Sequence, residues 1–184
     1  VRLILRLLPV MRQRKSGQII NVSSIGVQTN MPRFSAYVAS KSALDAFSRC
    51  IASEIVDEKV HITTIHMPLV RTPMIAPTKM YDRFPTITPD EAADMICEAI
   101  IHRPKRIATP MGTLGQVLYA LNPKSIDYIL NTAYHLFPDS SAAKGDKAAS
   151  AGELKPGRGA ARTTEDQATN RQLAFAYLMR GVHW

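Results

Sequence analysis

Apolar residues recur along the chain in two alternating rhythms, one typical of amphipathic helices and one typical of buried strands. Helical spacing marks three long stretches, at 1–15, 35–57 and 88–102. Short apolar runs rich in β-branched residues predict three strands, at 18–23, 60–66 and 106–109. The order helix, strand, helix, strand, helix, strand favours an α/β fold, a parallel sheet with helices packed on its faces.

Local signals fix several element boundaries. Ser16-Gly17 is expected to end the first helix, whose apolar residues at helical spacing are Leu3, Leu7, Leu8 and Met11. Residues 24–34 contain Gly, Asn and Pro and predict a loop. Thr88-Pro89-Asp90-Glu91 predicts a helix start, because threonine can cap, proline fits the first helical position and glutamate completes a capping box. The helix at 35–57 is expected to use one apolar face, made of Val38, Leu44, Phe47, Ile51 and Ile55.

The chain divides into four predicted parts. Residues 1–110 form the α/β unit, and 111–138 form a helical C-terminal extension in which Asn122-Pro123 separates two helices. Residues 139–165 are dominated by Ala, Gly, Lys and Ser and predict a flexible linker. A short C-terminal helix is expected within 166–184.

Composition excludes several classes of protein. The net charge of +8 is dispersed and no nucleic-acid-binding motif accompanies it, so no nucleic acid partner is expected. No apolar run approaches the ~20 residues that a membrane-spanning helix needs. Cys50 and Cys97 match no metal-binding spacing and predict neither a metal site nor a disulfide framework. A cytoplasmic location is the resulting expectation.

Three residues could combine into a proton-transfer site. Tyr37 and Lys41 are four apart on a predicted helix and therefore share one face. Ser24 follows a predicted parallel strand, at the sheet edge where ligands of open α/β sheets bind. A lysine cation stabilises a phenolate, so Tyr37 could exchange a proton with an alcohol or carbonyl oxygen. Ser24 could hydrogen-bond the same oxygen.

These residues carry a specific resemblance. The strand ending Asn21-Val22-Ser23-Ser24, followed thirteen residues later by Tyr37-Val38-Ala39-Ser40-Lys41, resembles the short-chain dehydrogenase/reductase family, with its N-[VI]-S-S and Y-x-A-S-K segments. Pro68-Leu69-Val70-Arg71-Thr72 is similar to the P-G-x-V-x-T segment of that family, with Leu69 in place of the glycine. The resemblance implies Ser24, Tyr37 and Lys41 as catalytic residues. It implies NAD(P)(H) as cofactor, NADP being slightly favoured, bound by five residues: Tyr37, Lys41, Pro68, Val70 and Thr72.

Other family segments are missing. The chain lacks the glycine-rich T-G-x-x-x-G-x-G turn and the N-N-A-G segment, and the catalytic asparagine would fall just before Val1. We therefore expect the C-terminal portion of a Rossmann-like, doubly wound parallel sheet, with its last three strands and their helices. The explanation favoured by the sequence is a fragment or a truncated reading frame, in which strand 18–23 exposes an unpaired edge.

The substrate and the partners are less constrained. The loop after Thr72 is rich in apolar residues and favours an apolar substrate, although the same side chains could simply close the core. The C-terminal segments, including Pro123-Lys124-Ser125 and Gly181-Val182-His183-Trp184, resemble bacterial fatty acyl-CoA and fatty aldehyde reductases, which implies a long-chain aldehyde, ketone or acyl substrate. Residues 112–137 could pack on the domain or on a dimer partner, or contact a membrane surface, and the full-length protein is expected to be a homo-oligomer. The alternative function is an inactive fragment or a non-catalytic interaction module.

Overall fold

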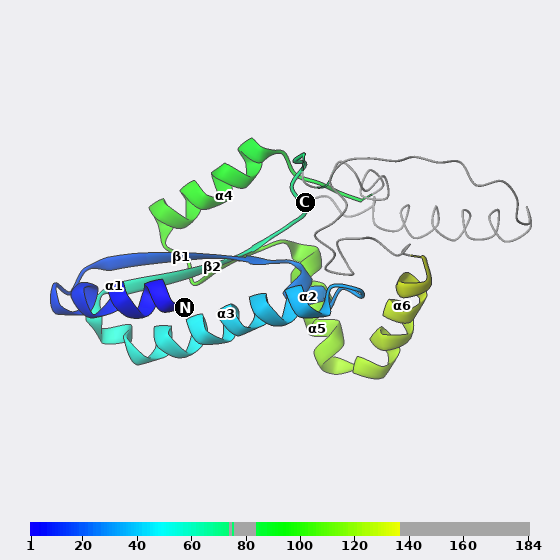
Figure 1. Ribbon diagram of the computed structural model, residues 1–184, viewed down its shortest axis with the longest axis horizontal. Coiled ribbons are helices and arrows are strands. Elements are labelled where there is room, and N and C mark those ends of the chain that lie inside the picture. The colour runs from blue at the N-terminus through cyan, green and yellow to red at the C-terminus, as the bar shows by residue number, and fades with distance from the viewer. Residues whose placement is uncertain (74, 76–83, 137–184) are drawn as a thin grey trace, which may run out of the picture.

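Three parallel strands form the centre of the fold (Figure 1). The structure is a computed structural model that describes residues 1–73, 75 and 84–136. The strands are β1 (Gly17–Ser24), β2 (Val60–Met67) and β3 (Arg106–Ala108), in the spatial order β1-β2-β3. β1 pairs with β2 along its whole length, from Gly17 opposite Val60 to Ser24 opposite Met67. This register brings the carboxyl ends of the two strands together.

Helices cover both faces of the sheet, as a doubly wound fold requires. Figure 1 shows α1 (Arg2–Gln13) and α3 (Ser35–Glu54) on one face and α4 (Pro89–His102) on the other. Each strand-to-strand connection passes through a helix, which is the geometry that parallel pairing imposes. The predicted α/β class and the predicted order of elements are confirmed.

The sequence signals located some element ends well and missed others. The capping box of α4 is present, with the Thr88 amide donating to Glu91 Oε2 at 2.7 Å and the Glu91 amide donating to Thr88 Oγ1 at 3.2 Å. The predicted loop at 24–34 instead contains a short helix, α2 (Gly26–Thr29). The predicted helix 35–57 ends at Glu54 and gives way to a 3₁₀ turn, η1 (Val56–Glu58).

The buried face of α1 differs from the predicted one. Ile4 and Leu8 are buried, whereas Leu3 and Leu7 are exposed. Ile4, Leu8 and Met11 form an i, i+4, i+7 stripe, and this stripe faces the sheet. Leu8 joins a core cluster with Ile55, Val60 and Ile62.

The helical extension continues from β3 and packs back on α2. It consists of α5 (Pro110–Leu121) and α6 (Pro123–Leu136). Thr109 caps α5 by accepting a hydrogen bond from the Gly112 amide at 3.1 Å. Gly112 allows close approach, since a Cβ there would lie 2.4 Å from Oε1 of the buried Gln28. The predicted linker at 139–165 and the predicted helix within 166–184 lie outside the described residues.

The other edge of β1 has no strand partner among the described residues. None of the helices that the structure describes is both long enough and apolar enough to cross a membrane.

Adjacent leucines on α1 test the burial pattern. Leu8 is 5% exposed and Leu7 is 46% exposed. Leu8→Ala should reduce the free energy of unfolding by about 2–4 kcal/mol, because it leaves a cavity beside Ile55. Leu7→Ala should change it by less than about 1 kcal/mol. Urea unfolding of both variants measures this difference, and equal losses would contradict the assigned face.

Two glycines of α5 test its docking on α2. Gly112→Ala should lower stability by about 1–3 kcal/mol, because its Cβ overlaps the side chain of Gln28, which is only 1% exposed and must shift within a packed region. Gly115→Ala is the matched control. Its Cβ would lie no closer than 3.5 Å to Thr29, so the higher helix propensity of alanine should leave stability unchanged or raise it by up to about 1 kcal/mol. The melting temperatures of the two variants measure this difference. A Gly115→Ala chain that melts below the Gly112→Ala chain would contradict the docking of α5 on α2.

Candidate active site

The predicted catalytic serine lies where two strands end. Ser24 is the last residue of β1, and the next amide, of Ile25, donates to the Met67 carbonyl at the end of β2 at 2.9 Å. The Ser24 Oγ accepts a hydrogen bond from the Gly26 amide at 3.1 Å. A hydroxyl has one proton and two lone pairs, so this bond leaves the Ser24 proton available to another acceptor.

Helix α3 brings Tyr37 and Lys41 to the same strand. The Lys41 Nζ donates to the Val22 carbonyl at 2.9 Å, two residues before Ser24. The same Nζ lies 6.0 Å from the centroid of the Tyr37 ring, the outer limit of a cation–π contact. Tyr37 is 47% exposed, so its phenol is accessible. Ser24, Tyr37 and Lys41 therefore gather at one end of β1.

The other predicted cofactor residues follow β2. A parallel bridge joins Val70 to Ile87, and the Arg71 amide donates to the Ile87 carbonyl at 2.8 Å. This bridge holds the segment against the start of α4. Pro68 is buried, and the buried Thr72 Oγ1 has no hydrogen-bond partner among the described residues. Of the predicted apolar loop, Met74 and 76–83 lie outside the described residues.

One sequence-based correspondence is wrong. When Val70 and Thr72 are set on the Val and Thr of P-G-x-V-x-T, the family's Pro-Gly pair falls on Met67 and Pro68. Leu69 therefore occupies a variable position and does not replace the glycine. The residue at the glycine position is Pro68.

The sequence analysis missed the polar contacts that hold α3 on the sheet. The only α3 residues that are fully buried are Asp45 and Ser48, whereas Val38, Leu44, Phe47 and Ile51 are only partly buried. Asn21 Nδ2 donates to Ser48 Oγ at 2.7 Å, and Ser48 Oγ donates to the Leu44 carbonyl at 2.7 Å. The available signal was an asparagine within an apolar strand, because such a residue needs a partner when it is buried.

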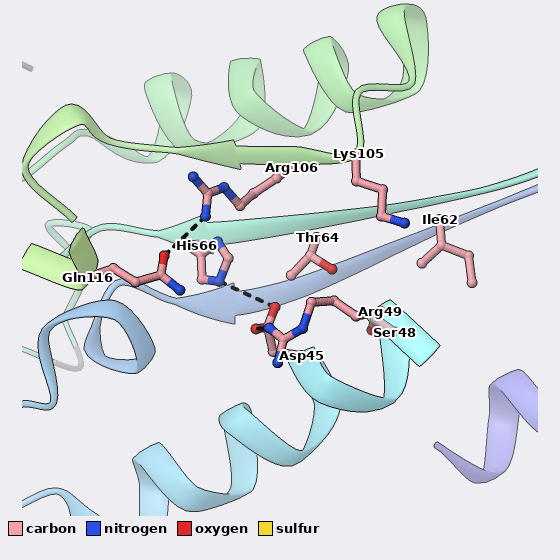
Figure 2. A pocket seen from close by; sticks show the side chains of 9 residues that line it. All are labelled: Asp45, Ser48, Arg49, Ile62, Thr64, His66, Lys105, Arg106 and Gln116. Carbon is pink, nitrogen blue, oxygen red and sulfur yellow. Dashed lines mark hydrogen bonds and ion pairs between the residues drawn. The ribbon is translucent and has the colours of Figure 1, made fainter. Parts of the chain in front are cut away.

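A second missed group joins α3 to β2. Asp45 forms an ion pair with Arg49 on its own helix and contacts His66, whose Nε2 lies 3.3 Å from Asp45 Oδ1 (Figure 2). Burial lowers the pKa of His66, the charges of Arg106 and Arg49 lower it further, and Asp45 opposes them. His66 is therefore neutral at pH 7. The Asp45-to-Arg49 spacing of four was the visible signal for part of this group.

Comparison with known proteins supports the resemblance that the motifs carry. A family model described as short chain dehydrogenase matches residues 1–81, which include Ser24, Tyr37, Lys41 and Thr72. Over these residues the chain matches the short-chain dehydrogenase/reductase family, as its motifs indicated. Solved structures share its fold: a short-chain dehydrogenase from Streptomyces avermitilis (TM-score 0.56, 24% identity, 73% of this chain and 57% of that one) and one from Burkholderia cenocepacia in complex with NADP (TM-score 0.55, 21% identity, 66% and 50%).

Two curated relatives are similar to the chain along its whole length. The chain is 50% identical over its whole length to a fatty acyl-CoA reductase of Acinetobacter baylyi, of which it covers 56%. It is 47% identical, again over its whole length, to an uncharacterized oxidoreductase of Mycobacterium tuberculosis, of which it covers 50%. The chain thus spans about half the length of these relatives.

The buried histidine gives a pH dependence with a defined sign. Because the pKa of His66 is lower in the folded chain, the unfolded chain binds the proton first as the pH falls. The contribution of His66 to the free energy of unfolding should be fully present above pH ~6.5, the ordinary pKa of histidine. It should decrease below that pH until His66 in the folded chain is also protonated. Urea unfolding between these limits should show a flatter pH profile for His66→Gln.

Exposed His61, on the same strand, supplies the matched control. His61→Gln should keep the slope of the unchanged chain. If the unchanged chain and His66→Gln lost stability in parallel on acidification, the buried neutral histidine would be ruled out.

Proposed function

We propose that this chain supplies the proton-transfer part of an oxidoreductase that transfers hydride between a nicotinamide dinucleotide and a carbonyl or alcohol. The observation that carries the proposal is the position of Lys41. Its ammonium group is bound to the Val22 carbonyl, beside the Tyr37 ring and two residues from Ser24. An ammonium group in this position favours negative charge on the phenol oxygen, and the accessible Tyr37 is the group that exchanges a proton with the substrate oxygen.

Each catalytic residue has a separate role in reduction. Tyr37 donates a proton to the substrate oxygen as hydride reaches the carbon, and the product is an alcohol. Ser24 donates a hydrogen bond to the same oxygen, since the Gly26 amide occupies only one of its lone pairs. In the oxidative direction the same groups work in reverse, with Tyr37 as the base.

The residues after β2 fit a nicotinamide. A bound nicotinamide dinucleotide supplies or accepts the hydride. The buried Thr72 hydroxyl lacks a partner among the described residues, so a carboxamide would satisfy it, and the Val70–Ile87 bridge holds the segment in place. We assign Tyr37 and Lys41 to the cofactor site as well, together with Pro68, Val70 and Thr72, and NADPH as the slightly favoured donor.

The substrate class follows from the relatives and from the loop. Two curated relatives are named fatty acyl-CoA reductase, one 50% identical over all 184 residues and one 44% identical over 131. The described apolar side chains of the loop after β2, on Ile75, Phe84 and Ile87, are partly buried. We propose a long-chain aldehyde or acyl substrate.

A non-catalytic interaction module is the second candidate. The observation that favours it is the outer edge of β1, which has no strand partner among the described residues and could pair with a strand of another chain.

A hybrid reductase separates the two candidates. In it, this chain replaces the matched segment of the Acinetobacter baylyi fatty acyl-CoA reductase, which supplies the remaining 44% of the protein. The hybrid should oxidise NADPH in the presence of a long-chain acyl-CoA or aldehyde. Tyr37→Phe in the hybrid should lower kcat about 10²- to 10⁴-fold, because the proton donor is lost.

Matched controls make the result decisive. Tyr128→Phe removes the hydroxyl of an exposed tyrosine on α6 and should leave kcat unchanged. A hybrid that folds, as judged by circular dichroism and gel filtration, yet has no reductase activity would favour the interaction module. Equal rates for Tyr37→Phe and the unchanged hybrid would rule out Tyr37 as the proton donor.

A further inference from the structure

A cavity of about 290 Å³ opens on the α3 face of the sheet, beside the edge strand β3 (Figure 2). Its floor is formed by β2 side chains, including Thr64 and His66. One wall comes from α3 and the opposite wall from Lys105 and the first residue of β3, with Gln116 of α5 at one end. Asp45, the α3 residue of the lining that is nearest to the candidate active site, lies eight residues beyond Tyr37, about 12 Å along the helix axis. The cavity therefore lies beside the candidate active site, and none of Ser24, Tyr37 and Lys41 lines it.

The charge of the lining is positive. Arg49, Lys105 and Arg106 provide three positive charges and Asp45 one negative charge, so the lining carries +2 with His66 neutral. Asp45 is already paired with Arg49 and His66. No acidic side chain among the described residues pairs with Lys105 or Arg106. The Arg106 guanidinium donates instead to the neutral Gln116 Oε1 at 3.1 Å, which fixes its position in the cavity wall.

His66 adds a buried acceptor to this positive lining. The side chain is 3% exposed, and its Nε2 faces Asp45 Oδ1, which places the proton of the neutral ring on that nitrogen. The other nitrogen, Nδ1, has no hydrogen-bond partner among the described residues. Figure 2 places the ring between Asp45 and Arg106, within the cavity. A ligand that fits both features is an anion that also carries a hydrogen-bond donor.

We propose that this cavity binds the phosphate group of a small phosphate monoester. In its singly protonated form, the P–OH group donates to His66 Nδ1, and the charged oxygens accept from Lys105 and Arg106. Arginine and lysine are the usual partners of phosphate oxygens. The cavity is near the lower limit of small-molecule sites, so it accommodates a phosphate and a few carbon atoms.

The proposal can be tested by calorimetry on the purified protein at pH 6, where about half of a phosphate monoester carries the P–OH proton, with glycerol 1-phosphate, inorganic phosphate and sulfate as probes. Both phosphates should bind saturably, and the ester should bind at least as tightly as inorganic phosphate. Sulfate carries no proton at this pH and cannot donate to His66 Nδ1. Its affinity should therefore be at least about tenfold lower than that of the phosphates. Equal affinity for sulfate, binding of inorganic phosphate alone, or no saturable binding would overturn the proposal.

Substitutions assign the binding to this cavity. Arg106→Ala and Lys105→Ala should each weaken phosphate binding about tenfold, the effect of losing one charge-assisted hydrogen bond. Arg103→Ala removes a nearby exposed arginine that does not line the cavity and should have no effect. Lys105 and Arg106 are exposed, so their replacement should leave the fold intact. Equal weakening by all three variants would indicate a diffuse charge effect and overturn the assignment.

Discussion

Helix α3 is attached to the sheet by a stripe of polar side chains, and the arrangement of the candidate active site depends on this attachment. Lys41, Asp45 and Ser48 are spaced i, i+4, i+7, so they project from one face of the helix. Each bonds a different part of the sheet: the Val22 carbonyl, His66 and Asn21. An apolar interface would tolerate sliding of the helix along its axis, whereas these directional bonds favour one position.

That position has a chemical consequence. Tyr37 is one turn before Lys41, so the bonds that fix α3 also fix the phenol relative to the end of β1. The parallel pairing of β1 with β2 brings Ser24 and the segment with Thr72 to the same edge of the sheet. The hydrogen-bonded pairing of β1 with β2 and the polar contacts between α3 and the sheet thus determine the positions of all the proposed catalytic groups.

The polar attachment also shapes the region beyond the active site. Asp45 is fully occupied by Arg49 and His66, which leaves the cations of β3 and its preceding loop without an acidic partner among the described residues. The result is a positively charged cavity whose floor contains a histidine nitrogen with no hydrogen-bond partner in the part of the chain that the structure describes. The same stripe therefore connects the proposed proton-transfer site at one end of α3 with a proposed phosphate site nearer the other.

Local and regular features were predictable from the sequence. The thirteen-residue spacing from Ser24 to Tyr37, the four-residue spacing to Lys41 and the capping box at Thr88 each depend on near neighbours, and the elements carrying them lie where expected. The buried face of α1, the docking of α5 on α2 through Gly112, and the Asp45–His66 pair were not predicted. These features depend on the relative placement of segments distant in sequence. Leu3 and Leu7 match a helical period as well as Ile4 and Leu8 do, and only the sheet decides which pair is buried.

The most direct test of this account is a crystal structure of the hybrid reductase with NADP bound. The account predicts that the Lys41 Nζ stays within hydrogen-bonding distance of the Val22 carbonyl. It also predicts that the nicotinamide carboxamide contacts the Thr72 hydroxyl and that the Tyr37 oxygen faces the hydride-transfer carbon. A well-folded hybrid in which Lys41 points to solvent, or in which the nicotinamide lies away from Tyr37 and Thr72, would contradict the claim that the polar attachment of α3 builds the active site.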